Sequence, residues 1–121
     1  EIIRPEDLRV RTVAKDSTRK ISIIQAIDRR VALDDLAESK GMSMEEILEE
    51  IEAIVYSGTR LNINYFIEEV VDPDEEEEIY DYFKTAENDN IQTAMEVLGY
   101  DDYDELHVRL VRIKFQSELG N

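Results

Sequence analysis

The sequence predicts a mainly α-helical protein with one short strand or wing, and three observations support this prediction. A capping box, Ser43 followed by Glu46, precedes an unbroken apolar stripe with helical spacing. Glycines stand directly after three helical patterns, at Gly41, Gly58 and Gly99. A period of two replaces helical spacing in a short stretch after Gly58. Short helices joined by tight turns therefore account for most of the chain.

Length and composition are those of one folded domain. The chain has 121 residues, of which 42% are apolar, and only four Gly and two Pro. It has no cysteine, which excludes disulfide scaffolds, thiolate zinc sites and thiol catalysis. No apolar run approaches the roughly 20 residues of a membrane span, and no signal-peptide pattern opens the chain. We therefore expect a soluble, cytoplasmic protein with no membrane partner.

Charge is unevenly distributed along the sequence. Residues 1–40 hold nine Lys or Arg and eight Asp or Glu, a net charge of +1. Residues 41–121 hold five basic and twenty-two acidic residues, a net charge of −17. Because Lys and Arg provide most nucleic-acid affinity, the acidic part should repel nucleic acid or bind a basic partner. Any DNA contact must come mostly from the first 40 residues.

Residues 1–16 alternate charged and apolar residues without a helical stripe and contain Pro5. We interpret this segment as a linker or arm. Since the sequence starts at Glu1 without a Met, we expect it to be part of a longer protein.

Helical spacing begins at Ser17 and predicts two helices before Gly41. The first has an apolar face of five residues: Ile21, Ile23, Ile24, Ile27 and Val31. The second runs from about Leu33 to Lys40. Asp34 and Asp35 suit its positive N-terminal end, and Gly41 ends it by adopting a backbone conformation that other residues resist.

The third predicted helix follows the capping box and ends at Gly58. Its apolar stripe has six members: Met44, Ile47, Leu48, Ile51, Ile54 and Val55. Beyond it, apolar or aromatic side chains alternate with polar ones: Leu61, Ile63 and Tyr65 with Arg60, Asn62 and Asn64. That alternation is typical of a short strand or an extended wing.

The second and third predicted helices have the spacing of a helix-turn-helix motif. Ala37 is followed by Gly41 four residues later and by Ile47 six residues beyond. A small Ala lets the helices cross closely, Gly permits the sharp turn, and Ile47 fills the angle between the helices. Leu36 and Met42 complete this scaffold. With the first helix and the wing, we predict a winged-helix-like helix-turn-helix unit over residues 17–70.

Residues 71–121 are predicted to form a small three-helix acidic unit that packs on the first unit as one compact domain. Asp72 caps the first of these helices, with Pro73 in its first turn. Its inner face has four members: Ile79, Tyr82, Phe83 and Ala86. The next helix carries Ile91, Ala94, Met95 and Leu98 at helical spacing and ends at Gly99.

The last predicted helix, from about Asp104 to Glu118, has two apolar stripes. One contains Leu106, Leu110 and Ile113, and the nearly opposite one contains Val108, Val111 and Phe115. A helix that is apolar on opposite sides must be covered on both. Either layers of its own fold cover it, or the second stripe is an interface in a homodimer.

The third helix is poorly suited to reading DNA. Its outward residues are five glutamates: Glu45, Glu46, Glu49, Glu50 and Glu52. No Lys or Arg lies between Met44 and Thr59, so these carboxylates would face phosphates without compensation. If DNA contact exists, the candidates are basic residues of the first helix and the wing: Arg19, Lys20, Arg29, Arg30 and Arg60. The alternative is that these are solvated charges paired with nearby acids.

Other chemistry has little support. The run Glu75–Glu78 suits the N-terminal turns of a helix, and neither Asp-rich loop has the Gly that an EF-hand requires. His107 is the only histidine and has no His or Cys partner for zinc. Four of the six tyrosines lie among acids, which favours packing over base stacking: Tyr80, Tyr82, Tyr100 and Tyr103. We therefore expect no catalytic residue and no metal site.

Several runs resemble the extreme C-terminal region of bacterial RecQ-family ATP-dependent DNA helicases. They are Lys20–Gly58, the following run Gly58–Tyr65, and the tail Arg109–Phe115. The most specific parts are Ile23–Asp28 and the junction Tyr56–Thr59. The resemblance covers about 100 of the 121 residues.

This resemblance implies a helix-turn-helix accessory domain that follows the motor, the zinc-binding segment and the winged-helix and HRDC modules. The family unwinds duplex DNA in the 3′ to 5′ direction with ATP and magnesium, in recombination and repair. Only the scaffold positions Ala37, Gly41, Ile47 and Gly58 are carried over. The chain has neither a phosphate-binding Gly-x-x-x-x-Gly-Lys-Ser/Thr loop nor the cysteines of the zinc segment.

We therefore expect a non-catalytic accessory domain that acts as a protein-interaction or regulatory module. Its expected partners are the rest of the helicase and a protein with a basic surface. ATP, magnesium, DNA and a nucleoid location are implied only for the parent helicase. Auxiliary DNA binding through the basic first helix and the wing is the alternative.

Overall fold

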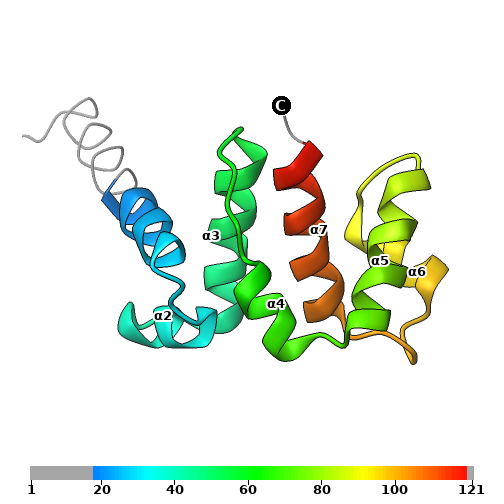
Figure 1. Ribbon diagram of the computed structural model, residues 1–121, viewed down its shortest axis with the longest axis horizontal. Coiled ribbons are helices and arrows are strands. Elements are labelled where there is room, and N and C mark those ends of the chain that lie inside the picture. The colour runs from blue at the N-terminus through cyan, green and yellow to red at the C-terminus, as the bar shows by residue number, and fades with distance from the viewer. Residues whose placement is uncertain (1–17, 120–121) are drawn as a thin grey trace, which may run out of the picture.

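The computed structural model describes residues 18–119 as a series of short α-helices joined by tight turns (Figure 1). The first helix covers residues 18–28. Six helices follow: α2 (Leu33–Ser39), α3 (Met44–Tyr56), α4 (Asn64–Val70), α5 (Pro73–Thr85), α6 (Ile91–Leu98) and α7 (Glu105–Leu119). Residues 18–119 contain no β-strand, which confirms the mainly α prediction. None of these helices is both long and apolar enough to cross a membrane. The predicted arm, residues 1–16, lies outside the described residues.

Local signals account for the start of α3. The Ser43 hydroxyl accepts a hydrogen bond from the Glu46 N–H at 3.1 Å, and the Glu46 carboxylate accepts one from the Ser43 N–H at 2.9 Å. Two of the N–H groups that a helix start leaves unpaired are satisfied in this way. The start of α3 is thereby fixed by residues that are close in sequence.

The predicted strand or wing after Gly58 is wrong. Leu61 and Ile63 are buried and Arg60 and Asn62 are exposed, so the alternation is real, but no second strand pairs with the segment. The Leu61 N–H instead donates to the hydroxyl of Ser117 on α7. Helix α4 then begins at Asn64. The alternation arises because an irregular segment inserts two apolar side chains into a helical core.

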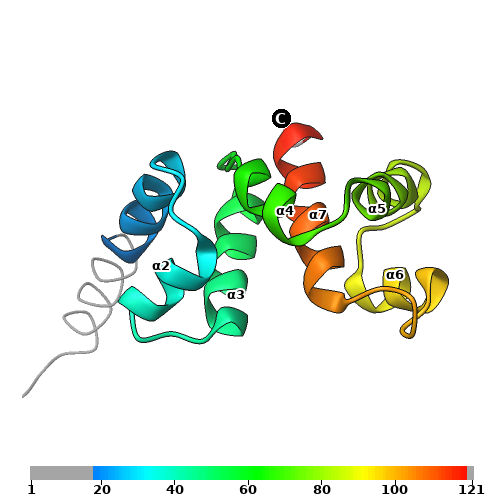
Figure 2. The same cartoon turned by 60° about the horizontal axis from the view of Figure 1, so that its bottom comes forward.

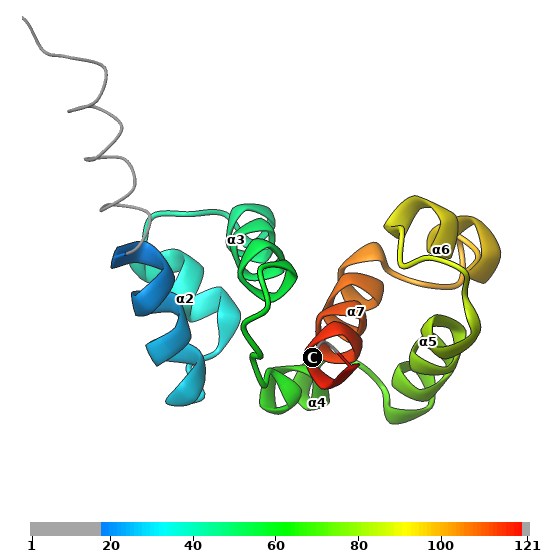
Figure 3. The same ribbon diagram turned by 90° about the horizontal axis from the view of Figure 1, so that it is seen from above.

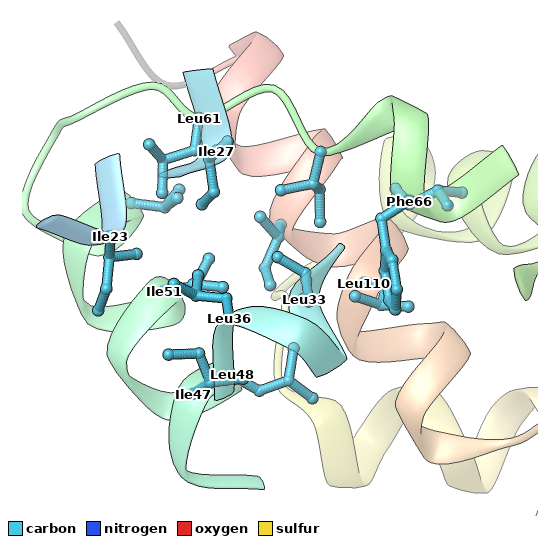
Figure 4. Packing of buried hydrophobic residues seen from close by; sticks show 14 of the residues in the cluster. Ile23, Ile27, Leu33, Leu36, Ile47, Leu48, Ile51, Leu61, Phe66 and Leu110 are labelled. Atoms are coloured by element: carbon cyan, nitrogen blue, oxygen red, sulfur yellow. The ribbon is translucent and has the colours of Figure 1, made fainter. Parts of the chain in front are cut away.

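The larger hydrophobic core joins the first helix, α2, α3, α4 and α7 (Figure 4). Its largest fully buried side chains include Ile23, Leu33, Ile47, Ile51 and Leu110. Burial of each such side chain stabilises the fold by about 1.5–3 kcal/mol relative to exposure. This core therefore holds the helix-turn-helix region against a helix from the far end of the chain.

A second core lies between α5, α6 and α7. Its buried members are Ile79, Phe83, Ala94, Met95, Val108 and Val111. Phe115 packs beside it, with its ring 5.7 Å from that of Tyr80 and 5.8 Å from that of Phe83. Figures 2 and 3 show α7 between α3 and α4 on one side and α5 and α6 on the other.

The two stripes of the last helix are both covered inside the protein. Leu110 and Ile113 belong to the larger core, while Val108 and Val111 belong to the second. Val108 and Val111 are fully buried, so the prediction that they lie at an exposed interface is wrong. Phe115 is half-buried against Tyr80 and Phe83, and a homodimer stays a prediction. The predicted boundary at residue 70, between two units of one domain, stays a prediction.

Candidate functional site

The helix-turn-helix motif is formed by α2 and α3. Leu36, Ala37 and Ile47 are buried, and Met42 is half-buried beside them. Gly41 has a φ of 66°, in the left-handed region that glycine adopts most easily. Its conformation lets the Met42 N–H donate to the Ala37 carbonyl at 2.9 Å, which closes the end of α2. These residues therefore lie where a tight turn between two helices needs them.

Gly58 has the same role at the end of α3. Its φ is 108°, and the Thr59 N–H donates to the Ile54 carbonyl at 3.3 Å. The chain then turns away from the helix axis toward Leu61. This turn places the segment after α3 against the end of α7.

Two arginines of α7 bind the acidic side of α3. Arg109 donates through Nε and Nη2 to the two carboxylate oxygens of Glu52, at 3.0 and 2.7 Å. Its Nη1 donates to both carboxylate oxygens of Glu45, each at 2.7 Å. Arg112 donates to Glu52 at 2.8 Å and to the Asp89 carbonyl at 2.9 Å. We call Glu45, Glu52, Arg109 and Arg112 the α3–α7 ion cluster.

The centre of this cluster is buried. The side chains of Arg109 and Glu52 are 8% and 15% exposed, whereas that of Glu45 is 63% exposed. Burial alone would raise the pKa of Glu52, but hydrogen bonds and positive charge from Arg109 and Arg112 outweigh it and lower that pKa. The hydrogen bond with Glu52 raises the pKa of Arg109, so both groups stay ionised. The Arg109–Glu52 pair is therefore the strongest polar contact between the two helices.

The α3–α7 ion cluster covers one side of α3. In a DNA reader the second helix of the motif enters the major groove, and its outward side chains contact bases and phosphates. Here Glu45 and Glu52, two of the outward residues, are held by another helix of the same chain. The guanidinium groups of Arg109 and Arg112 are directed at carboxylates, so they are not available to phosphates.

The remaining outward glutamates of α3 differ from one another. Glu50 pairs with Arg19 of the first helix at 2.6 Å. Glu46 belongs to the capping box, where hydrogen bonds with the backbone and side chain of Ser43 lower its pKa. Glu49 is exposed. The prediction that all five glutamates lack compensating charge is therefore wrong for Glu45, Glu50 and Glu52.

The five predicted DNA contacts differ in their surroundings. Arg19 is bound to Glu50, and Lys20 is half-buried. Arg29 and Arg30 are exposed and, like Lys20, make no ion pair with any described residue. Arg30 has a φ of 62° at the end of the first helix, a position that usually favours glycine. Whether any of the five contacts DNA stays a prediction.

Arg30 and Arg60 line a polar groove that the sequence did not indicate. Two adjoining cavities of about 330 and 430 Å³ share Asp28, Asn62 and Asn64. The first extends to Arg30 and the second extends to Arg60 and the end of α7. We call this feature the junction groove, because it lies where the end of the first helix, the segment after α3 and the end of α7 meet.

Carboxylates line the junction groove as densely as cations. Glu68 of α4 borders the first cavity, and Lys114 and Glu118 of α7 border the second. Lys114 also pairs with Glu76 of α5. The groove is therefore polar and of mixed charge, in contrast to the strongly acidic surface of the protein as a whole.

Polar groups of the acidic unit are engaged in structural contacts. The Tyr80 and Tyr103 hydroxyls donate to Glu118 and Glu78, each at 2.6 Å, and these hydrogen bonds raise the pKa of each tyrosine to about 12. His107 lies 2.6 Å from a Glu75 oxygen. Within the described part of the chain, no group of three or more His, Asp or Glu side chains could hold a metal ion.

Comparison with known families agrees with this motif. Residues 17–67 match the family described as RecQ-1-like, helix-turn-helix domain. This part of the chain is therefore similar to RecQ-1-like helix-turn-helix domains. The match includes the first helix, α2, α3 and the first turn of α4, so it confirms the RecQ resemblance for that region. A search of curated proteins returned no match for this chain.

The match ends before the helix that binds α3. Arg109 and Arg112 belong to α7, which lies outside residues 17–67. Sequence reasoning missed both as partners of α3, although two arginines at a spacing of three between the two apolar stripes of α7 are a signal. A helix beyond the matched residues therefore covers part of the second helix of the motif.

Proposed function

We propose that this chain is a non-catalytic accessory module of a RecQ-type DNA helicase, and that it acts through protein contacts. In this proposal α3 is a structural helix and does not read DNA. The rest of the helicase would perform ATP- and magnesium-dependent unwinding in recombination and repair. The module would then be located with its parent at the nucleoid in the cytoplasm.

The observation that supports this proposal is the α3–α7 ion cluster. A helix can enter a DNA groove only if its outward face is free and compatible with phosphates. The face of α3 carries five glutamates, and two of them are bound by Arg109 and Arg112. Freeing α3 would leave buried charges unpaired, which costs several kcal/mol.

The charge of the chain indicates the partner. Its formal net charge is −16, and most of the acidic residues lie beyond residue 40. Such a surface attracts a basic protein and increases the rate of encounter with it, whereas it repels nucleic acid. We therefore propose a protein partner with a basic surface.

Titration of the chain with labelled single-stranded, duplex and forked DNA at two salt concentrations tests this proposal. We expect no saturable change in fluorescence anisotropy at moderate salt. The variant Glu49→Lys places a cation on the exposed face of α3, and Glu96→Lys makes the same charge change on α6. Equal responses of the two variants are expected. Tight binding by the wild type, or a gain specific to Glu49→Lys, would overturn the proposal.

Auxiliary DNA contact through the first helix is a second candidate. It is favoured by the exposed side chains of Arg29 and Arg30, which have no ion-pair partner among the described residues. It predicts weak binding that falls steeply with salt. In the full helicase, Arg29→Glu with Arg30→Glu should then weaken DNA binding, while Lys84→Glu on α5 should not. Unchanged binding by the double variant would exclude this candidate.

A further inference from the structure

We propose that a cleft between α3 and α7 binds an arginine side chain of a partner protein. Three residues of α3, two of α7 and one from the segment between α5 and α6 line it: Glu52, Ala53, Tyr56, Arg112, Gln116 and Asp89. We call it the α3–α7 cleft. This inference rests on the proposed function, because it gives the proposed basic partner a place to bind. It goes further by naming the side chains that would hold one of the partner's cations.

Tyr56 provides an aromatic face that the fold does not use. The residue is 87% exposed, more than any other large apolar residue of the described chain. Within residues 18–119 its ring contacts no other aromatic ring and its hydroxyl makes no hydrogen bond, whereas the hydroxyls of Tyr80 and Tyr103 are bound to glutamates. A planar guanidinium can stack on such a face. Tyr and Arg are also among the residues that contribute most to protein interfaces.

Asp89 places a carboxylate in the same cleft. Its Oδ2 accepts a hydrogen bond from the side-chain amide of Gln116 at 2.5 Å, which holds the carboxylate at the wall. Arg112 binds the backbone carbonyl of Asp89 and not its side chain. Among the described residues, no Lys or Arg forms an ion pair with this carboxylate, and its Oδ1 accepts no hydrogen bond. Oδ1 can therefore accept a charge-assisted hydrogen bond from a guanidinium.

The charge around the cleft favours a cation although Arg112 lines it. In the α3–α7 ion cluster, two guanidinium groups are balanced by two carboxylates. The Nη atoms of Arg112 donate to Glu52 and to the Asp89 carbonyl, and its Nε is buried, so a ligand does not reach it. Asp89 and Glu49, which lies one turn before Ala53, then add negative charge that no cation of the described chain pairs with. A phosphate would be repelled by the same carboxylates.

The size of the cleft suits one side chain. Its volume is about 340 Å³, at the lower end of the roughly 300–1,000 Å³ that is usual for ligand sites. Its walls come from helices that the ion cluster already joins. A partner would therefore bind a preorganised site.

A synthetic Gly–Ser peptide that carries three arginines provides the probe, and the same peptide with citrulline, which has the shape of arginine without its charge, is the control. The isotope-labelled 121-residue chain is titrated and followed by NMR at about 0.1 M salt, where distant charges are largely screened. We expect saturable shifts concentrated at the backbone amides of Ala53 and Tyr56 and at the side-chain amide of Gln116. The citrulline peptide should cause none.

Two variants, each with a matched control, test the two sides of the site. Tyr56→Ala should weaken binding of the arginine peptide about threefold, whereas Tyr100→Ala, at another exposed tyrosine, should change it less than about 1.5-fold. Asp89→Asn keeps an oxygen for Gln116 but removes the charge, and should also weaken binding about threefold. Asp101→Asn makes the same change at an exposed aspartate outside the cleft and should change binding less than about 1.5-fold. Since all four residues are exposed, the variants should fold normally.

The outcomes separate this inference from the proposed function. Shifts spread over the acidic surface, or equal effects of each variant and its control, would overturn the cleft inference while a basic protein partner stands. Equal binding of the citrulline peptide, or no binding of the arginine peptide, would also overturn the inference. If forked DNA causes saturable shifts at Tyr56 and Ala53, the cleft takes nucleic acid, and both the inference and the proposed function fail.

Discussion

Arg109 and Glu52 lie 57 residues apart in sequence and are joined side by side by two hydrogen bonds of 3.0 and 2.7 Å. This paired geometry matches the planar guanidinium to the carboxylate and is stronger than a single contact. It connects α3, which lies within the matched residues 17–67, to α7, which lies beyond them. The same contact therefore joins the two helices and covers part of the outward face of α3.

Arg109→Ala should destabilise the protein strongly. It leaves Glu52 mostly buried without its main partner, which costs about 3 kcal/mol in comparable buried pairs. Urea unfolding followed by circular dichroism measures the change. In a double-mutant cycle with Glu52→Gln, the two effects should be clearly non-additive. Additive effects would show that the pair contributes no coupling energy.

Acid should weaken the contact between α3 and α7. The folded-state pKa of Glu52 lies below the ordinary value of 4.5, so its ionised form stabilises the fold above that value. This contribution is lost as pH falls through the lower, folded-state pKa. The free energy of unfolding, measured from about pH 7 to about pH 3, should therefore decrease more in the wild type than in Glu52→Gln. Parallel pH profiles for the two proteins would contradict the role assigned to Glu52.

Backbone conformation at the two turns predicts opposite effects of two substitutions. Arg30 has a φ of 62°, so Arg30→Gly should relieve strain and stabilise the protein by roughly 1 kcal/mol. Gly41 has a φ of 66°, and a Cβ added there would meet no atom within 4 Å. Gly41→Ala should therefore destabilise by roughly 1 kcal/mol through backbone strain alone. In thermal unfolding, the melting temperature of Arg30→Gly should lie above that of the wild type, and that of Gly41→Ala should lie below it.

Phe115→Glu should lower stability without changing the mass in solution. The ring contacts Tyr80 and Phe83 inside the protein, so a carboxylate there disrupts the second core. Light scattering and thermal unfolding of the same sample separate the two effects. A wild-type dimer that Phe115→Glu converts to a monomer would restore the interface hypothesis for the second stripe.

Much of the fold could be predicted because its signals are local. Ser43 with Glu46 fixed the start of α3, and Gly41 fixed the turn before it. The segment after Gly58 could not be predicted from its alternation, because a period of two in side-chain burial does not require a strand partner. Leu61 is buried, as the alternation predicts, but its N–H donates to the side chain of Ser117, 56 residues away, and not to a neighbouring strand.

The candidate site was less predictable because its contacts are distant in sequence. The outward position of Glu52 followed from helical spacing, but its pairing with Arg109 depends on how α7 packs. The junction groove was missed for the same reason. Asp28 and Glu118 lie 90 residues apart in sequence, and only the tertiary fold brings them to the same cavity.

The central claim is that α3 is held by α7 and does not contact DNA. NMR of the isotope-labelled chain during titration with forked DNA at low salt tests it most directly, because each α3 amide reports separately. The exposed positions Glu49 and Tyr56 are the most informative, since they would move first if DNA approached this helix. We expect their signals to remain unchanged at saturating DNA. Progressive, saturable shifts at these positions, with loss of the Arg109–Glu52 contact, would contradict the claim.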